Sequence, residues 1–344
     1  MGFYEAIKKI DENKENISIT FIEGKNVGEK LLLSDGEEVF STNSGIDWNE
    51  IIKTIPQGGK SQVLETEEGK IFVEYIHKKH SVVVCGAGHI SIPIIKMCQL
   101  LDLSVTVIDD RLTFTNNARL AGANHVICEP FEEALRKIEG DKGTFFIIVT
   151  RGHRYDQICL ENIIKKENVY IGMIGSRSRV AKVLRYLETE KGIPREKLDR
   201  VYTPIGLDIG AETPAEIAVA IMAEIIEVKN KGMEAASFTD EVLDGIIRDP
   251  YRDIPKAVVT IVSRKGSIPR EVGTKMVVLK DGTMLGTIGG GCVEANIRQI
   301  ALNCIDSGQC QLVKEDMTGR DAEEDGMVCG GIAELFVEPI GTDY

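Results

Sequence analysis

Two glycine-rich turns in this sequence have residue types that bind anions, and one of them also carries sulfur. Gly289-Gly290-Gly291 is followed directly by Cys292 at the expected start of a helix, and Glu294 lies in the first turn of that helix. Three successive glycines leave a backbone almost free of side chains, which suits close approach to an anion. A thiol at a helix N-terminus has its pKa lowered. The pattern therefore predicts a site that binds a phosphate-bearing ligand and presents sulfur to it.

A second cysteine and a cationic loop belong to the same segment. Cys329 precedes Gly330-Gly331 and an apolar strand, and Arg270 lies in a loop that is rich in cations. We interpret Cys292 and Cys329 as reactive thiols, and Glu294 as a helix cap or a group that acts on a substrate. The alternative is that these glycines serve only tight turns and that the thiols are incidental.

The first turn, Gly86-x-Gly88-x-x-Ser91, follows an apolar strand and opens a helix. In the dinucleotide-binding fingerprint, the first glycine permits the tight turn, the second admits a phosphate, and the helix N-terminus supplies N–H donors. Asp109 ends the next strand about 20 residues later, where a ribose-binding carboxylate is expected. The turn predicts a Rossmann-like fold, whose ligand is either a dinucleotide or another compound held by the same scaffold.

Further polar residues follow the later strands of this segment. Arg151 and His153 come after one strand, and Ser176 and Arg177 come after the next. Because open α/β sheets bind ligands at the carboxyl ends of their strands, we expect these side chains to gather there. The arginines suit phosphate or carboxylate, and His153 with Asp156 suits proton exchange. The alternative for His153 is a structural hydrogen bond within a loop.

The central segment must position these residues. Short apolar runs rich in β-branched residues alternate with helical patterns, which is typical of a parallel, doubly wound sheet. The sequence Thr213-Pro214-Ala215-Glu216 predicts a capped helix that runs to about Lys229. The expected strands are Ser81–Cys85, Val105–Asp109, His125–Cys128, Thr144–Thr150 and Val169–Ile174, and the expected helices include Ser91–Leu101 and Asp156–Lys166.

The segments on either side of this region resemble each other. Val27–Leu33 parallels Val272–Val278, and Ile71–Glu74 parallels Leu335–Glu338. Strands joined by Asp-Gly turns indicate hairpins. We therefore predict an α/β protein in which a Rossmann-like doubly wound parallel sheet is flanked by two small α+β modules, the N-terminal one degenerate because it lacks the glycine triplet. The alternative is two unrelated β-rich segments. The expected domains are residues 1–78, 79–231 and 237–344.

Composition argues against several classes of function. The 344 residues carry a formal net charge of −13 with a pI of about 5.1, which argues against non-specific binding to nucleic acid or to an anionic membrane. The sequence shows neither a signal peptide nor an apolar run of the roughly 18–20 residues that span a bilayer, so a cytoplasmic location is expected. Its eight cysteines include no CxxC pair. Four of them are expected to be buried thiols, namely Cys85, Cys98, Cys128 and Cys159.

These segments together resemble the XdhC/CoxI family, the accessory proteins of xanthine dehydrogenase and related molybdenum hydroxylases. The resemblance covers roughly residues 80–344 and rests on many blocks in two modules. The blocks are Gly86-Ala87-Gly88-His89, Asp109–Arg111, Thr150–His153, Gly172–Arg177, Pro204–Ala211, Thr213–Ala218, Gly266–Arg270, Gly273–Met276, Gly286–Glu294 and Cys329–Gly331. In the usual family layout the glycine-cysteine module precedes the Rossmann domain, whereas here the intact copy follows it.

The resemblance implies a function. Members of this family bind molybdenum cofactor (molybdopterin), assist its sulfuration by a cysteine desulfurase and deliver it to an apo-hydroxylase, so a non-catalytic maturation chaperone is expected. Cys292, Cys329 and Glu294 are expected to be the catalytic residues, with the two thiols near the molybdenum. The implied cofactor-binding residues are Gly86, Gly88, His89, Asp109, Arg151, His153, Ser176, Arg177, Arg270, Gly289, Gly290 and Gly291.

Two other functions and an oligomeric state stay open. A homodimer would let the intact module of one protomer face the Rossmann cleft of another. The main alternative function is an NAD(P)-dependent oxidoreductase, although no Tyr-x-x-x-Lys pair stands out. A third function is that of a nucleotide-sensing adaptor.

Overall fold

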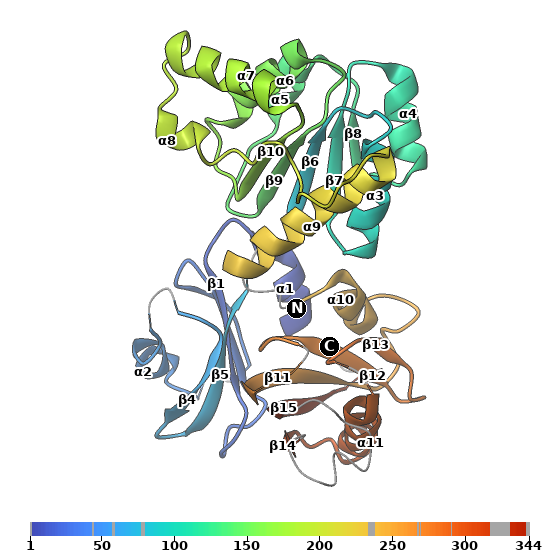
Figure 1. The fold of residues 1–344 in the computed structure, drawn as a ribbon. Helices are drawn as coiled ribbons and strands as arrows, with labels where there is room; N and C mark the ends of the chain where they lie inside the picture. The colour runs from blue at the N-terminus through green and yellow to red at the C-terminus, as the bar shows by residue number, and fades with distance from the viewer. Residues whose placement is uncertain are drawn as a thin grey trace. The chain divides into compact units, whose positions relative to one another are not determined.

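The chain folds into two compact units, one of which is assembled from both ends of the sequence (Figure 1). The computed structural model describes residues 2–42, 45–56, 59–76, 80–232, 238–266, 268, 270–289, 291–316 and 331–341. Residues 1–78 and 234–344 make up the first unit, here called the terminal unit. Residues 79–233 make up the second, here called the central unit. The central unit is thus inserted in sequence between the two halves of the terminal unit.

A five-stranded parallel sheet forms the centre of the central unit. Its strands are β6 (Ser81–Cys85), β7 (Ser104–Ile108), β8 (His125–Ile127), β9 (Thr144–Ile148) and β10 (Tyr170–Met173), in the spatial order β10-β9-β6-β7-β8. The expected parallel sheet is confirmed, and every expected strand lies within two residues of the observed bounds. The short apolar runs were therefore a sound guide to the strands.

Helices cover both faces of this sheet because alternate residues of each strand point to opposite sides. Val82 and Val84 of β6 pack on one side, and Val83 and Cys85 pack on the other. The first side is covered by α3 (Ser91–Leu100), α4 (Leu112–Leu120) and α9 (Pro214–Gly232), and the second by α5 (Phe131–Lys137), α6 (His153–Ile163), α7 (Arg177–Thr189) and α8 (Arg195–Leu198). The sheet is therefore doubly wound, as predicted.

The strand order places the topological switch point of the sheet between β6 and β9. These strands are neighbours in the sheet, although β7 and β8 separate them in sequence. The chain order reverses at this point, and crevices in open α/β sheets form outside the carboxyl ends of the strands at such a switch point. A ligand site is therefore expected at the turns that follow β6 and β9.

The predicted capping of the last central helix is confirmed. The Thr213 hydroxyl accepts a hydrogen bond from the Glu216 backbone N–H at 3.3 Å, and the Glu216 carboxylate accepts one from the Thr213 N–H at 2.9 Å. This reciprocal pair satisfies donors that the first helical turn would otherwise leave free. The helix α9 continues to Gly232, slightly beyond the expected end.

Two antiparallel sheets with matching strand orders form the terminal unit. The first contains β1 (Asn16–Phe21), β2 (Lys30–Ser34), β3 (Glu37–Ser41), β4 (Gln62–Thr66) and β5 (Gly69–Ile76), in the order β3-β2-β1-β5-β4. The second contains β11 (Lys256–Gly266), β12 (Lys275–Leu279), β13 (Met284–Gly286), β14 (Gln311–Asp316) and β15 (Gly331–Ile340), in the order β13-β12-β11-β15-β14. Taken in chain order, each strand of one sheet has a counterpart at the same place in the other.

Each sheet of the terminal unit has helices packed on it. Trp48 and Ile51 of α2 (Trp48–Lys53) join the apolar cluster of the first sheet, and Ile297 and Ala301 of α11 (Gly291–Ser307) join that of the second. The helices α1 (Phe3–Lys9) and α10 (Asp240–Ile247) pack together in a cluster that includes Leu32, Val258 and Val277 from both sheets. A single apolar core therefore joins segments from the two ends of the chain.

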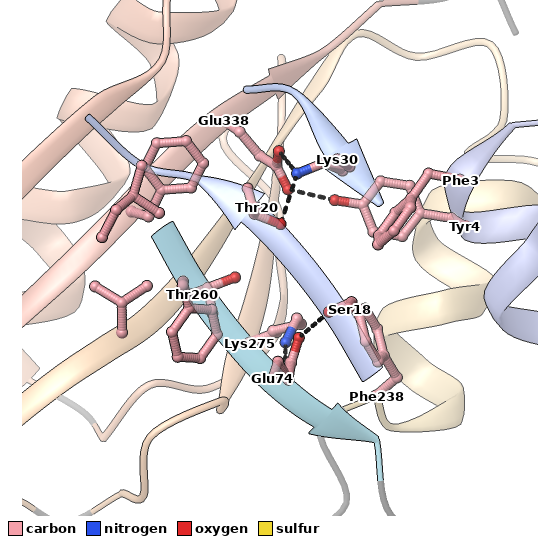
Figure 2. Close-up of a pocket in the computed structure, with 14 residues that line it drawn as sticks. Phe3, Tyr4, Ser18, Thr20, Lys30, Glu74, Phe238, Thr260, Lys275 and Glu338 are labelled. Carbon is pink, nitrogen blue, oxygen red and sulfur yellow. Dashed lines mark hydrogen bonds and ion pairs between the residues drawn. The ribbon is translucent and has the colours of Figure 1, made fainter. Parts of the chain in front are cut away.

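Two reciprocal ion pairs cross between these sheets (Figure 2). Lys30 Nζ lies 2.5 Å from a Glu338 carboxylate oxygen, and Lys275 is bound in the same way to Glu74. The two lysines hold matching register positions, since Lys30 lies opposite Thr20 and Lys275 opposite Thr260. Each sheet thus supplies one lysine and one glutamate to the other.

The ion pairs line a small polar cavity within the terminal unit. Its volume is about 20 Å³, and Thr20 and Thr260 contribute to its wall. Such a space accommodates about one water molecule. The Tyr4 hydroxyl donates to Glu338 at 2.5 Å, and the Ser18 hydroxyl donates to Glu74 at 3.3 Å. Both buried carboxylates therefore have a second hydrogen-bond donor besides their lysine.

Within the described residues, every helix falls short of the combined length and hydropathy that a bilayer-spanning segment requires.

Candidate functional site

The turn after β6 is shaped by a glycine that no other residue can replace without strain. Gly86 has φ +112°, and a Cβ built there would lie 2.5 Å from the carbonyl oxygen of Val149, which follows β9. The backbone of this turn therefore touches the backbone of the neighbouring strand. This contact holds the two turns of the switch point together.

The second glycine of the turn faces open space. A Cβ at Gly88 would have no heavy atom within 4 Å. Ser91, at the start of α3, is fully buried and donates its hydroxyl to the Gly86 carbonyl at 2.5 Å. This bond ties the helix to the turn, so the third fingerprint position has a structural role. The opening beside Gly88 leaves room for a ligand group at the N-terminus of α3.

Asp109 lies directly after β7, and both oxygens of its carboxylate accept hydrogen bonds from the protein itself. Oδ2 accepts a hydrogen bond from the Ala87 N–H at 2.8 Å, and the Arg111 guanidinium donates to both oxygens at 2.8 Å. Burial by itself would raise the pKa of Asp109, but the hydrogen bonds from Arg111 and Ala87 outweigh it and lower that pKa. The side chain is 1% exposed, so the residue expected to bind ribose is enclosed by its own chain.

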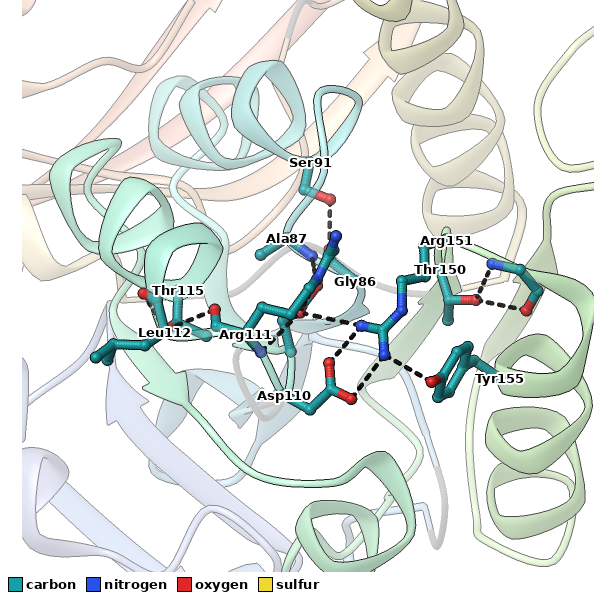
Figure 3. Close-up of polar contacts among 12 residues, drawn as sticks. Gly86, Ala87, Ser91, Asp110, Arg111, Leu112, Thr115, Thr150, Arg151 and Tyr155 are labelled. Atoms are coloured by element: carbon teal, nitrogen blue, oxygen red, sulfur yellow. Dashed lines mark hydrogen bonds and ion pairs between the residues drawn. The ribbon is translucent and has the colours of Figure 1, made fainter.

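A second acid–arginine pair lies beside the first (Figure 3). Arg151 makes a two-pronged contact with Asp110, donates to the Tyr155 hydroxyl at 2.6 Å, and stacks on the Tyr155 ring at 4.1 Å. The hydrogen bond from Arg151 lowers the pKa of Asp110, and the same contact raises the pKa of Arg151. This edge of the sheet therefore carries two arginines, each paired with a carboxylate.

The turn after β9 contains a buried carboxyl group. The Thr150 hydroxyl donates to Asp156 at 2.6 Å, and Asp156 is 2% exposed in the first turn of α6. Burial raises the pKa of Asp156 to about 6. His153 is exposed at the first position of the same helix. A carboxyl group with this pKa exchanges a proton near neutral pH, and proton exchange between Asp156 and His153 stays a prediction.

Asparagine in place of Asp156 is expected to stabilise the central unit by about 2–3 kcal/mol above pH 6, and by little below about pH 4. A carboxyl group whose pKa is raised on folding opposes folding once it ionises. This penalty is absent below the unfolded pKa, grows as pH rises towards 6, and is complete above it. Asparagine keeps an acceptor for Thr150 but carries no charge.

Urea unfolding of both proteins between pH 4 and pH 8 measures this difference. Asp110→Asn is the control, because the pKa of Asp110 is lowered and its contribution to stability is instead lost as pH falls. A stabilisation by Asp156→Asn that is equal at pH 4 and pH 8 would contradict the assignment.

The remaining predicted residues of the central unit are exposed. His89 lies in the turn before α3, Ser176 precedes α7, and Arg177 is the first residue of α7. Ser176 contacts the Ser178 hydroxyl at 3.3 Å. Because β10 and β9 are adjacent and parallel, Ser176 and Arg177 lie at the same edge of the sheet as Arg151. The exposed side chains of His89, Ser176 and Arg177 are therefore available to a ligand.

In the terminal unit, Glu294 organises the glycine-rich turn. Its carboxylate accepts hydrogen bonds from the Thr287 hydroxyl at 2.5 Å and from the Ile288 N–H at 3.0 Å. Gly289 has φ +122°, and Gly291 is the first residue of α11. Cys292 is the second residue of this helix, so the expected helix start is confirmed. Glu294 therefore anchors the turn from inside the helix.

Several predicted residues of this module lie outside what the structure describes. These are Gly290, Cys329 and the side chain of Cys292. Arg270 is exposed, and its carbonyl accepts a hydrogen bond from Arg264 at 3.4 Å. Arg264 also pairs with Glu271 at 2.6 Å, so it shapes the cationic loop. Among the residues that the structure describes, no three His, Cys, Asp or Glu side chains converge as metal ligands.

Burial makes several of the described cysteines poor nucleophiles. Cys85, Cys98 and Cys159 are fully buried as expected, whereas Cys128 is only half-buried. Burial raises the pKa of Cys98 to about 12 and that of Cys310 to about 11. A thiol with such a pKa is protonated at neutral pH. These residues act as small apolar side chains.

Sequence reasoning missed Tyr155 and the pairing role of Arg111. Arg151 precedes α6, which begins at His153, so the helical spacing of four between Arg151 and Tyr155 gave no signal for their contact. The contact between Arg111 and Asp109 had no signal beyond adjacency, because the direction of a side chain in a turn depends on the turn geometry.

Two family models match this chain, and together they cover more than half of its length. The XdhC Rossmann domain matches residues 82–225, and the XdhC and CoxI family matches residues 252–315. The chain belongs to the XdhC and CoxI family. The observed doubly wound sheet is thus the XdhC Rossmann domain, and the second match includes the glycine-rich turn and all of α11.

Relatives of this XdhC-family chain include two curated bacterial proteins. An uncharacterised protein of Escherichia coli K12, YqeB, is 31% identical over 161 residues, which is 46% of this chain and 29% of YqeB. A Bacillus subtilis 168 protein described as a probable subunit of xanthine dehydrogenase is 28% identical over 161 residues, which is 47% of this chain and 46% of that protein. The matched segment thus spans less than half of both relatives.

Among solved structures, a bacterial one has a similar fold. The crystal structure of a xanthine dehydrogenase from Bacillus halodurans has a TM-score of 0.52 and 24% identity to this chain. The match covers 64% of this chain and 63% of that one.

Proposed function

We propose that this protein is a non-catalytic accessory factor that binds molybdenum cofactor, supports its sulfuration and inserts it into a molybdenum hydroxylase of the xanthine dehydrogenase type. The observation that carries this proposal is the presence of both XdhC-family matches in one chain. The names of the Bacillus relatives, a xanthine dehydrogenase and a probable subunit of one, point to the same partner class. A cysteine desulfurase would supply the sulfur.

The geometry of the Rossmann edge fits a ligand with a phosphate. The space beside Gly88 accepts a group that a Cβ would otherwise fill, and it adjoins the N-terminus of α3. Arg111 and Arg151 lie at the edge of the same crevice and supply guanidinium donors, which pair well with phosphate. The cofactor carries a terminal phosphate that these donors would hold, with Arg177 and His89 exposed at the same edge.

We assign the handling of metal and sulfur to residues of the terminal unit. Cys292 lies at the start of α11 beside the glycine-rich turn, and Cys329 precedes β15. Soft sulfur ligands suit a metal such as molybdenum, and a thiolate at a helix start is favoured. We assign the same cofactor role to Gly289, Gly290, Gly291 and Arg270, and place Glu294 in support of the turn.

The proposal extends to domain origin, location and assembly. Residues 1–78 would be a degenerate copy of residues 237–344, which the matching strand orders of the two sheets support. The protein would act in the cytoplasm as a homodimer. Light scattering tests the assembly, since a monomer at micromolar concentration would contradict it.

The first test is retention of the cofactor. The protein is purified anaerobically with added molybdenum cofactor, and released pterin is oxidised and measured by fluorescence. Near-stoichiometric pterin is expected. Absence of pterin, together with tight binding of NAD(P), would favour an oxidoreductase or a nucleotide sensor instead.

The double variant Cys292→Ala, Cys329→Ala is expected to abolish activation of the apo-hydroxylase, because neither thiol of the glycine-rich loops would remain to ligate the metal or relay sulfur. Activation is measured as hydroxylase turnover after incubation with loaded protein and desulfurase. Cys310→Ala is the control, since that half-buried thiol has a pKa of about 11 and lies in the same unit. Full activation by the double variant would exclude a role for these thiols.

A further inference from the structure

The acidic residue at the end of the second Rossmann strand is the usual receptor for the ribose of a dinucleotide. Asp109 has that position, directly after β7 and opposite the Gly86 turn, whose Ala87 N–H it binds at 2.8 Å. A ribose hydroxyl needs a free lone pair on this carboxylate. The number of lone pairs that remain free therefore decides which ligands can bind here.

Hydrogen bonds from within the chain fill this carboxylate. Oδ1 accepts from the Arg111 backbone N–H at 3.1 Å and from its Nε at 2.8 Å. Oδ2 accepts from the Ala87 N–H and from Arg111 Nη2, both at 2.8 Å. A carboxylate offers roughly four acceptor positions, and these four bonds use them. A ribose diol would have to displace Arg111 to bind.

Arg111 is held firmly in this position. Its guanidinium carbon lies 3.6 Å from the centre of the Phe114 ring, in the first turn of α4. The Arg111 side chain is 31% exposed while that of Asp109 is 1% exposed, so the guanidinium is the part of the pair that solvent reaches. A ligand that enters here therefore meets a cation and N–H donors instead of a carboxylate.

The neighbouring pair repeats the arrangement. Asp110 is bound on both oxygens by Arg151, and Arg151 Nη1 also lies 3.9 Å from Asp109. Asp110 is thus paired on each oxygen, and Asp109, at the ribose position, is the acid whose four acceptor positions are all used. Both guanidiniums keep N–H groups that are not used on the acids, and such groups bind phosphate oxygens strongly.

We propose that Arg111 determines the ligand specificity of this cleft: it occupies the receptor for a ribose diol and selects ligands that place a phosphate monoester there. The inference rests on the proposed function in taking the Rossmann edge as the ligand site, and it adds the class of ligand. A free adenosine ribose, as in NAD, is excluded. A terminal phosphate, as on a pterin cofactor, is accepted.

Two matched probes test this selection on the full chain. NADP⁺ carries a phosphate monoester on the adenosine ribose, and NAD⁺ carries the free diol. Calorimetric titration of the wild type is expected to give at least about tenfold tighter binding of NADP⁺ than of NAD⁺. In Arg111→Met, NAD⁺ binding is expected to strengthen and NADP⁺ binding to weaken, so that the preference is lost or reversed.

Control variants keep the test decisive. Arg119→Met removes an exposed arginine from α4, the helix that follows Arg111, where it binds Asn116, and should leave the preference unchanged. Arg111→Lys keeps a cation beside Asp109 and replaces Arg111→Met if the latter fails to fold, since lysine cannot cover both oxygens at once. It is expected to gain NAD⁺ affinity relative to the wild type.

Three results would overturn the assignment: equal affinities in the wild type, an unchanged ratio in the folded Arg111 variants, or no gain of NAD⁺ binding in either of them. Pterin retention with an unchanged ratio would reject the role of Arg111 and leave the proposed function in place. An altered ratio without pterin retention would reject the proposed function and keep the role of Arg111.

Discussion

Replacement of Lys275 by methionine is expected to lower the free energy of unfolding of the terminal unit by about 3–5 kcal/mol. The Lys275 side chain is 4% exposed, and its partner Glu74 is 3% exposed. Burial lowers the pKa of Lys275, against the opposing effect of Glu74, so the pair is held in a poorly hydrated site. Removal of the cation leaves a buried carboxylate whose nearest remaining donor is the Ser18 hydroxyl at 3.3 Å.

The single tryptophan of the chain reports on this unit. Trp48 is 6% exposed in α2 and packs 5.7 Å from Phe21, measured between ring centres. Its fluorescence during urea unfolding therefore follows the terminal unit. The free energy of unfolding of Lys275→Met is compared with that of the wild type at neutral pH.

An exposed pair provides the matched control. Lys70 lies 2.7 Å from Glu23 in the same unit, with exposed fractions of 36% and 55%. Lys70→Met should cost no more than about 1 kcal/mol. The double variant Lys275→Met, Glu74→Leu should recover most of the loss, because no buried charge remains. A loss below about 1 kcal/mol in Lys275→Met would show that the pair is not buried in solution.

The second large effect concerns the Rossmann turn. Gly86→Ala is expected to destabilise the central unit by more than about 2 kcal/mol. The added Cβ would lie 2.5 Å from the Val149 carbonyl oxygen and 2.9 Å from its carbon, and backbone atoms cannot rotate away as a side chain would. The φ of +112° adds strain for any residue with a Cβ. Far-UV circular dichroism during thermal unfolding measures the change.

Gly88→Ala is the internal comparison for this prediction. Nothing lies within 4 Å of the added methyl group, so the free energy of unfolding should change by no more than about 0.5 kcal/mol. The methyl group would instead fill the space assigned to the ligand, so retention of pterin should fall. Equal destabilisation by both substitutions would contradict the geometry of the turn.

The sequence was informative where a pattern is local. Parallel strands buried on both faces read as continuous apolar runs, and for this reason Ser81–Cys85 and its neighbours were placed to within two residues. The helix cap at Thr213 and Glu216 was also correct, because its residues lie within four positions of each other. The start of α6 was misplaced by three residues, since it begins directly after the extended Gly152.

Contacts between distant segments could not be predicted. The repeated segments that drew attention contain Lys30, Glu74, Lys275 and Glu338, yet nothing in their spacing indicates that each lysine binds the glutamate of the other sheet. Asp109 had the expected position for ribose binding, but its enclosure by Arg111 depends on a side-chain direction. The sequence therefore predicted where these residues lie along the chain, but not which side chains they contact.

The insertion of the central unit has a consequence for the order in which this protein is completed during synthesis. Glu74 leaves the ribosome 201 residues before Lys275, which is roughly 10–40 s at bacterial and eukaryotic elongation rates. All five strands of the parallel sheet are made in that interval. The central unit can therefore fold first, while Leu32 of the N-terminal sheet still lacks the apolar partners Val258 and Val277 that later strands supply. This exposed apolar surface is what a chaperone would need to shield.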